Sequence, residues 1–290
     1  MNASKLVLGT VQFGLNYGIS NTNGQTGFSE VCRILDFAYS NGINTLDTAA
    51  AYGESESVLG KALAETGLSG KMNIVSKVSP MPELEPEQAE TFIRNSLENS
   101  LKNLQQDSLH TLLFHREKDW KYADILKKIK GEGLIRNCGC SIDGAIPEKE
   151  EELEAVQVPG NVFDRRFLPF IRTQKTHSCA IYVRSVYLQG LLLMPEEKIP
   201  ASLNELIPYR RALAEIAREN DMPLAELCMR YLLSIPEITS VLTGVENTDQ
   251  LKINLQLAEK GGLPEDVMKK IFDTVPELPE QLIRPSLWKK

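Results

Sequence analysis

The sequence predicts an α/β fold in which residues 1–290 form a single (β/α)8 TIM barrel, and three observations support this prediction. Short apolar runs rich in β-branched residues alternate with longer segments of helical periodicity. Eight of these runs are strand candidates, the number that closes a barrel of this type. No linker rich in Pro, Gly or Ser and no shift in composition divides the chain into two halves.

The predicted elements follow one another along the chain as strand and helix. The strands are short apolar runs that cover residues 5–10, 43–48, 73–78, 108–115, 137–142, 155–159, 180–185 and 239–244. The first helix begins near Ser29 and ends before Gly42, with Val31, Ile34 and Leu35 on one face. The other helices are predicted at residues 55–65, 86–104, 122–130, in a charged stretch from Pro147, and at 203–219 and 223–234.

A doubly wound parallel sheet is the other architecture that this alternation allows. Such sheets usually bind phosphate at a GxGxxG or GxxxxGK[ST] turn that directly follows a strand. No predicted strand here is followed by either turn. We therefore expect the barrel.

Composition and charge exclude several classes of function. Lys and Arg number 32 against 39 Asp and Glu, and the net charge of −7 argues against a nucleic-acid partner. No apolar run approaches the roughly 20 residues that cross a membrane, and the N-terminus lacks a secretory signal. Five cysteines without a CxxC pair fit a reducing cytoplasm. With three histidines and no zinc spacing we expect no metal, and we interpret His110 and His177 as structural or solvated.

Polar side chains stand where the second, third and fourth predicted strands end. Asp47 ends the second strand, Lys77 lies near the end of the third, His115 ends the fourth, and Tyr52 lies five residues after Asp47. Such strand ends gather at the face of a barrel that holds active sites. A lysine buried in an apolar strand needs a counterion, and Asp47 on the adjacent strand can supply it. The pair alone would suit a structural salt bridge, but with Tyr52 and His115 beside it we expect a catalytic site.

These four residues suit the reduction of a carbonyl group. A lysine ammonium beside the Tyr52 hydroxyl favours loss of the phenol proton, as a general acid at neutral pH requires. Asp47 would keep Lys77 charged. His115 could orient the carbonyl group and stabilise the charge that develops on its oxygen as hydride arrives.

Several stretches of the chain resemble the aldo-keto reductase family. Residues 47–63, DTAAAYGESESVLGKAL, are similar to the family signature DTAxxYGxSExxLGxAL, and SKV around Lys77 and LLFHRE around His115 match its next two blocks. The resemblance extends from Leu6 to about Glu259. It implies a catalytic tetrad of Asp47, Tyr52, Lys77 and His115, and a reaction in which nicotinamide hydride reduces an aldehyde or ketone.

The later blocks also resemble the family and imply where the cofactor binds. In GLIRNCGCSI and VQVPGNVFDRR, Ser141 and Gln157 take the positions that contact the nicotinamide carboxamide. In SVLTGVENTDQLKINL, a strand, loop and helix start take the place that offers backbone N–H groups to the adenosine phosphates. The full set of implied cofactor residues is Gly9, Thr10, Asp47, Ser141, Gln157, Arg184, Gly190, Thr243, Gly244, Gln250 and Asn254.

The chain departs from the family pattern at four positions in or near these later blocks. Ile142 replaces an Asn, Gly160 a Tyr, and Ile253 a Glu that usually contacts the adenine. Arg184 replaces an aromatic residue that stacks on the nicotinamide, a role that a guanidinium plane can also fill unless it faces solvent. Residues 243–250 contain no Lys or Arg to pair with a 2′-phosphate. By analogy with the family we expect NADPH, with NADH as the alternative.

The expected partner is therefore a small-molecule carbonyl compound, sugar-like or a small aldehyde, while the oligomeric state has no signal in the sequence. Phe13, Tyr17 and Tyr187 are candidate walls of its pocket. Two other functions are open. The departures would suit a nicotinamide-binding sensor with little turnover, and Lys77 could form a Schiff base in a lyase or aldolase, although a protonated lysine argues against the latter.

Overall fold

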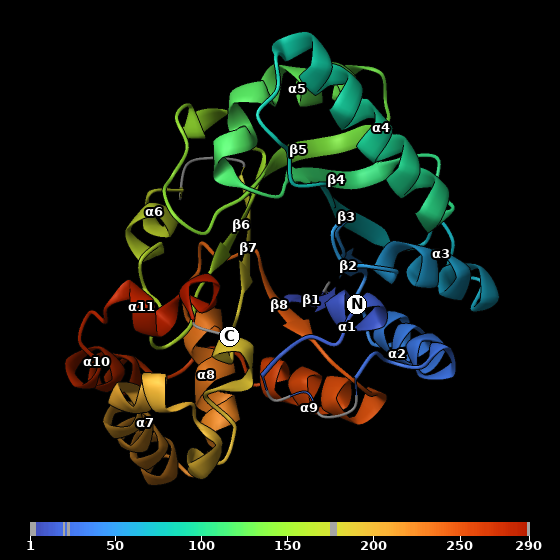
Figure 1. Cartoon of the computed structure of the whole chain (residues 1–290). Helices are drawn as coiled ribbons and strands as arrows, with labels where there is room; N and C mark the ends of the chain where they lie inside the picture. Colours follow the sequence, from blue (N-terminus) through green and yellow to red (C-terminus); the bar gives the residue numbers. More distant parts are fainter. Residues whose placement is uncertain (1–3, 20, 22–23, 175–178, 289–290) are drawn as a thin grey trace.

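The computed structural model describes residues 4–19, 21, 24–174 and 179–288. Within these residues, eight parallel strands close into a barrel in chain order, and β1 completes the ring by pairing with β8 (Figure 1). The strands are β1 Leu6–Gly9, β2 Thr45–Asp47, β3 Asn73–Val78, β4 Leu109–Phe114, β5 Ile135–Ser141, β6 Ala155–Pro159, β7 Ala180–Arg184 and β8 Ser240–Gly244. The predicted (β/α)8 barrel is confirmed. His177, interpreted above as structural or solvated, lies outside the described residues.

Helices surround the barrel and cover its outer face (Figure 1). They are α1 Val11–Gly14, α2 Phe28–Ser40, α3 Ser55–Glu65, α4 Pro86–Leu104, α5 Ala123–Gly131, α6 Leu168–Thr173, α7 Ile207–Glu219, α8 Leu224–Leu233, α9 Thr248–Glu259, α10 Glu265–Thr274 and α11 Glu280–Ile283. Helices α3 and α4 begin and end at the predicted residues, because an apolar stripe of helical period runs through each of them.

One predicted helix is wrong. The charged stretch that begins at Pro147 contains a single 3₁₀ turn, η2 Glu150–Glu152, instead of an α-helix. Lys149, just before this turn, adopts a left-handed backbone with φ of +56°. Strand β6 begins three residues after the turn ends at Glu152. The acidic residues cannot propagate a helix here, because no residue of η2 is buried.

Alternation along the strands decides which side chains enter the barrel. Val75 and Lys77 are two residues apart on β3, so they point to the same side of the sheet. Val75 belongs to a small apolar cluster that also contains Val7 from β1 and Leu113 from the adjacent strand β4. Lys77 therefore continues an apolar layer towards the carboxyl end of the strands, where its charge must be compensated.

Four of the five cysteines are buried thiols. Cys138, Cys140, Cys179 and Cys228 are at most 9% exposed, and burial raises the pKa of each thiol. Cys32 on α2 is partly exposed, and all five are unpaired. Within the described residues, none of the helices has both the length and the hydropathy of a membrane span.

Candidate active site

The carboxyl ends of β2, β3 and β4 bring the predicted catalytic side chains together. Asp47 is the last residue of β2, Lys77 the penultimate residue of β3, and His115 follows the end of β4. Tyr52 lies in the loop between β2 and α3 and lines a cavity that also reaches Asp47. Parallel register between adjacent strands explains this convergence, since Asp47 pairs with Val75, two residues before Lys77.

Lys77 and Asp47 form a buried ion pair. The side chains are 1% and 3% exposed, and Lys77 Nζ donates to Asp47 Oδ1 at 2.7 Å and Oδ2 at 2.9 Å. The same nitrogen donates to the carbonyl of Thr48 at 2.9 Å. Burial opposes the ammonium form, but the Asp47 carboxylate and Tyr52 outweigh it, so the pKa of Lys77 lies above its ordinary value. A permanently protonated lysine is a poor nucleophile, which argues against a Schiff-base mechanism.

Tyr52 contacts the side chains of Lys77 and His115. Lys77 Nζ lies 5.0 Å from the centroid of the Tyr52 ring. The His115 ring packs edge to face against it, with ring centroids 5.9 Å apart at 86°. The phenol of Tyr52 is thus held between a cation and an imidazole at the wall of the cavity.

A close backbone contact fixes the loop that carries Tyr52. Helix α1 packs on this loop, and a Cβ atom on Gly14 would lie 2.0 Å from the Tyr52 carbonyl oxygen and 2.2 Å from the Ser55 nitrogen. Ser55 Oγ donates to the Thr10 carbonyl at 2.7 Å, which ties the start of α3 to the end of β1. Glycine at position 14 therefore allows the first loop of the barrel to position the tyrosine.

His115 is neutral at physiological pH. Burial, followed by the charges of Lys77, Arg184 and Arg116, lowers its pKa to about 4. Its Nδ1 is buried and has no hydrogen-bond partner among the described residues. A neutral imidazole can donate one N–H to a ligand oxygen, which is the role that the sequence predicted for it.

The free energy of unfolding should depend on pH because His115 is buried in its neutral form. Between pH 6.5 and about 4 the unfolded chain binds a proton at His115 that the folded chain does not, so the free energy of unfolding falls as the pH falls. The difference in pKa corresponds to on the order of 3 kcal/mol, present in full above pH 6.5. Urea unfolding of wild type and His115→Gln at pH 7 and pH 4.5 measures it. The variant should lose less stability than wild type on acidification, and equal losses would contradict a buried neutral histidine.

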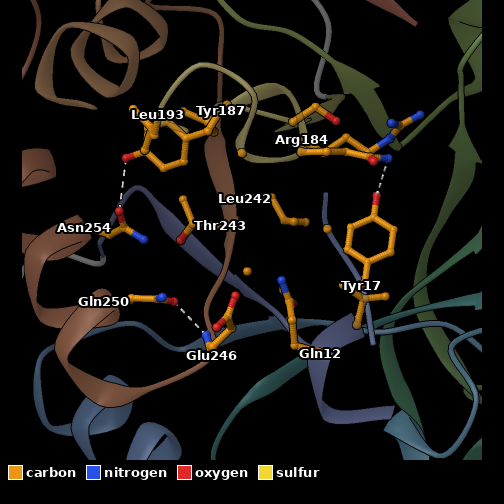
Figure 2. Close-up of a pocket in the computed structure, with 18 of the residues that line it drawn as sticks. Gln12, Tyr17, Arg184, Tyr187, Leu193, Leu242, Thr243, Glu246, Gln250 and Asn254 are labelled. Atoms are coloured by element: carbon orange, nitrogen blue, oxygen red, sulfur yellow. Dashed lines mark hydrogen bonds between the residues drawn. The ribbon is translucent and has the colours of Figure 1, made fainter. Parts of the chain in front are cut away.

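A cavity of about 720 Å³ extends from Tyr52 to the N-terminal end of α9. Figure 2 shows Arg184 and Tyr17 on one side of it, and Gln250 and Asn254 on the other. Its lining includes most of the predicted cofactor residues, namely Gly9, Thr10, Asp47, Gln157, Arg184, Gly190, Thr243, Gly244, Gln250 and Asn254. Ser141 ends β5 beside Gln157 but does not line this cavity.

The cavity wall carries polar atoms that fit an amide- and phosphate-bearing ligand. Gln12 Oε1 and Thr243 Oγ1 are buried and have no partner in the described part of the chain, and both residues line the cavity. A Cβ on Gly244 would lie 2.5 Å from Gln12 Oε1, so glycine leaves that amide room at the wall. Buried polar atoms are normally satisfied, so these positions point to a bound partner.

The start of α9 differs from the open anion site that the sequence predicted. Thr248 N donates to Glu30 Oε1 at 2.7 Å, Gln250 N to Asn247 Oδ1 at 2.9 Å, and Glu246 N to Gln250 Oε1 at 2.8 Å. Side chains of the protein therefore already satisfy these N–H groups. The acceptor from α2, Glu30, is far away in the sequence, which is why the pattern at the helix start did not reveal it.

The departures from the family pattern have separate structural outcomes. Ile142 is fully buried in the core, so its side chain offers nothing to a ligand. Ile253 is 53% exposed and lines the cavity. Arg184 does not face solvent freely, because its Nη2 donates to Asp143 Oδ1 at 3.1 Å.

Sequence reasoning missed several residues of the site. Gln12, Gln189, Lys198 and Glu246 all line the cavity. They lie in loops and short turns, where residue type alone does not indicate direction. Among the predicted aromatic walls, Tyr17 and Tyr187 line the cavity, but Phe13 is wrong, because the turn of α1 buries it completely in the core. No cluster of three or more His, Cys, Asp or Glu in the described ranges could hold a metal, and the absence of a metal stays a prediction.

The barrel, the four side chains at its carboxyl face and the adjoining cavity define an oxidoreductase site. Residues 5–275 match the model of the Aldo/keto reductase family, and the chain belongs to this family. Membership of this family supports NAD(P)H-dependent reduction of carbonyl groups as its general activity.

Known relatives are similar over most of the chain. The uncharacterized oxidoreductase YqkF of Bacillus subtilis is 27% identical, covering 91% of this chain and 94% of its own length. Glyoxal reductase of the same organism is 27% identical, with 82% of each chain covered. The holo form of aldo-keto reductase AKR11C1 from Bacillus halodurans superimposes with a TM-score of 0.76 at 24% identity, covering 97% of this chain and 96% of that one. At that identity the structural likeness shows the fold alone.

Proposed function

We propose that this protein reduces an aldehyde or ketone to an alcohol with NADPH or NADH, and that Tyr52 is the proton donor. The observation that supports this proposal most directly is the position of Tyr52. Its ring lies beside a buried ammonium and a neutral histidine, at the wall of a cavity of about 720 Å³.

When bound, a reduced nicotinamide supplies the hydride. The residues of this chain manage the proton and the charge. The Tyr52 hydroxyl donates its proton to the carbonyl oxygen, and the nearby Lys77 ammonium stabilises the phenolate that remains. Asp47 keeps Lys77 charged, and neutral His115 donates an N–H that orients the substrate oxygen.

The substrate of the proposed reaction is a small carbonyl compound. Exposed apolar side chains of Tyr17, Ile19 and Leu193 form part of the cavity lining. One relative is a glyoxal reductase, so glyoxal and other small aldehydes, with sugar aldehydes, form the first panel to assay. We further propose that the chain works in the cytoplasm without a nucleic-acid or membrane partner, because its charge is −7 and its cysteines are unpaired.

Two measurements test the proposed function. A thermal-shift comparison with NADPH, with NADH and with neither should show a raised midpoint with at least one cofactor, because ligands that bind the native state stabilise it. Consumption of that cofactor with the aldehyde panel should then exceed the buffer rate. A raised midpoint without turnover of any panel member would favour the sensor, and no shift with either cofactor would reject both functions.

The resemblance implies NADPH, but two carboxylates near the start of α9 favour the alternative, NADH. The acidic Glu246 lines the cavity beside Gln250 (Figure 2). Glu30 accepts a hydrogen bond from Thr248 N in the first turn of α9. Residues 243–250 supply no basic side chain, but Lys198, from another part of the chain, does line the cavity. A 2′-phosphate adds negative charge to the cofactor, so the Glu246 carboxylate near the start of α9 disfavours NADPH.

Replacing Glu246 with Gln should therefore change cofactor preference. We expect the Kd for NADPH to fall about threefold to tenfold, while the Kd for NADH changes less than about twofold. Isothermal titration calorimetry at low salt measures both constants. Lys198→Met is the matched opposite change and should weaken NADPH binding. An equal effect of Glu246→Gln on the two cofactors would show that Glu246 does not sense the 2′-phosphate.

A further inference from the structure

Arg184 is an unusual residue for its place in the cavity, and it is held by neighbours outside the cavity. It ends β7 and lines the same cavity as Tyr52. Its charge also contributes to the lowered pKa of His115, so it lies close enough to influence the catalytic side chains. Figure 2 shows it above Tyr17, across the cavity from Gln250.

The carboxylate of Asp143, which does not line the cavity, holds the guanidinium of Arg184. Asp143 Oδ1 accepts from Arg184 Nη2 at 3.1 Å, and the Ile142 carbonyl accepts from the same nitrogen at 3.3 Å. Asp143 lies two residues after the end of β5. Burial raises its pKa, but the charge of Arg184 and the hydrogen bonds from Arg284 and Ser286 outweigh this and lower it to about 2. The carboxylate is therefore ionised throughout the physiological range.

The second oxygen of this carboxylate accepts hydrogen bonds from the C-terminal segment, which we define as residues 280–287. Asp143 Oδ2 accepts from Arg284 Nε at 2.8 Å and from Ser286 Oγ at 2.8 Å. The segment lies beyond residue 275, where the match to the family model ends. One Asp143 side chain thus links a segment outside the matched barrel to a side chain in the cavity.

The C-terminal segment is itself anchored, so it can hold Asp143 in place. Leu282 and Ile283 of α11 are 7% and 2% exposed and belong to the main apolar core. Arg284 Nη1 donates to Glu280 Oε2 at 3.0 Å, and the Arg284 backbone nitrogen donates to the Glu280 carbonyl at 2.8 Å. The guanidinium that meets Asp143 is therefore fixed from both sides.

Arginine needs such support more than an aromatic residue does. An aromatic ring has two rotatable side-chain bonds, whereas an arginine has more and loses more rotamer entropy when it is fixed. Arg184 is 25% exposed at its side chain, so packing alone does not hold it. An ion pair that exists before the ligand arrives removes this cost from binding.

We propose that the C-terminal segment positions Arg184 for the nicotinamide end of the cavity, through the contacts of Arg284 and Ser286 with Asp143. The inference rests on the proposed function, since it assumes a nicotinamide cofactor in this cavity. Arg284 and Asp143 are positioning residues and need not touch the ligand themselves.

Cofactor binding to Arg284→Gln tests the proposal. Isothermal titration calorimetry with NADPH and NADH should show Kd raised about threefold to thirtyfold. Adenosine 2′,5′-bisphosphate and 5′-AMP, which lack the nicotinamide, should bind as they do to wild type. Arg284→Lys keeps a cation opposite Asp143 and should recover most of the affinity. Arg218→Gln removes an equally paired but exposed arginine on α7 and should leave all four constants unchanged.

A double substitution tests whether Arg284 affects cofactor binding through Arg184. In an Arg184→Leu background, adding Arg284→Gln should change the cofactor Kd no further, because the residue that it positions is gone. An additional loss there, or equal weakening of the adenosine fragments, would show general loosening and overturn the proposal. So would unchanged binding in Arg284→Gln. If wild type binds neither cofactor, the proposed function itself fails, which is a separate outcome.

Discussion

Replacing Tyr52 with Phe should lower kcat/KM for aldehyde reduction by about 10²- to 10⁴-fold while leaving the cofactor Kd nearly unchanged. The phenylalanine ring keeps the edge contact with His115 and the approach of Lys77 Nζ to its face. Only the hydroxyl, and with it the proton for the substrate oxygen, is removed. Steady-state consumption of the reduced cofactor and calorimetric titration of the cofactor measure the two quantities.

Tyr17→Phe is the matched control for this experiment. Tyr17 lines the same cavity, and its hydroxyl accepts a hydrogen bond from Gln189 Nε2 at 3.1 Å. Loss of that single hydrogen bond should reduce the rate less than about tenfold. If Tyr52→Phe retains a rate comparable to that of Tyr17→Phe, the proton comes from another group.

Replacing Lys77 with Met should have the second large effect, because it leaves the buried Asp47 carboxylate without its cation. We expect a loss of about 3–5 kcal/mol in the free energy of unfolding, together with loss of turnover. The hydrogen bond from Gln157 Nε2 to Asp47 Oδ1 at 2.7 Å remains but does not neutralise the charge. Urea denaturation at pH 7 measures the stability, and the aldehyde assay measures the activity.

The double variant Asp47→Asn with Lys77→Met separates stability from catalysis. Removing both charges should recover much of the stability lost in Lys77→Met, but turnover should stay absent, because no ammonium remains beside Tyr52. Lys270→Met, which breaks an exposed ion pair with Glu219, should cost less than about 1 kcal/mol. Recovery of activity in the double variant would show that the buried pair is only structural.

The sequence predicts that the proposed catalytic residues cluster, because regular strands control where they lie. Asp47, Lys77 and His115 each occupy the carboxyl end of a strand, and parallel register makes those ends meet. The barrel follows from the same periodicity. These features depend on apolar patterns that are local in the chain, so they can be read before any contact is known.

Contacts between distant polar residues leave no such pattern. Arg284 reaches Asp143 across 141 positions, and Glu30 reaches Thr248 across 218. Neither pair interrupts a helical or strand period, because all four residues lie on surfaces or in loops. The sequence therefore predicted an open anion site at α9 that Glu30 already fills, and it missed the support behind Arg184.

The burial of the cysteines has a practical consequence for handling this enzyme. Alkylating reagents and peroxide attack the thiolate, which burial disfavours at Cys138, Cys140, Cys179 and Cys228. Burial, with the charges of Glu65 and Asp36, also raises the pKa of Cys32. This thiol is nevertheless the partly exposed one, on the outer helix α2, so a maleimide dye should attach there first. A single fluorophore could then be introduced without mutating the native cysteines.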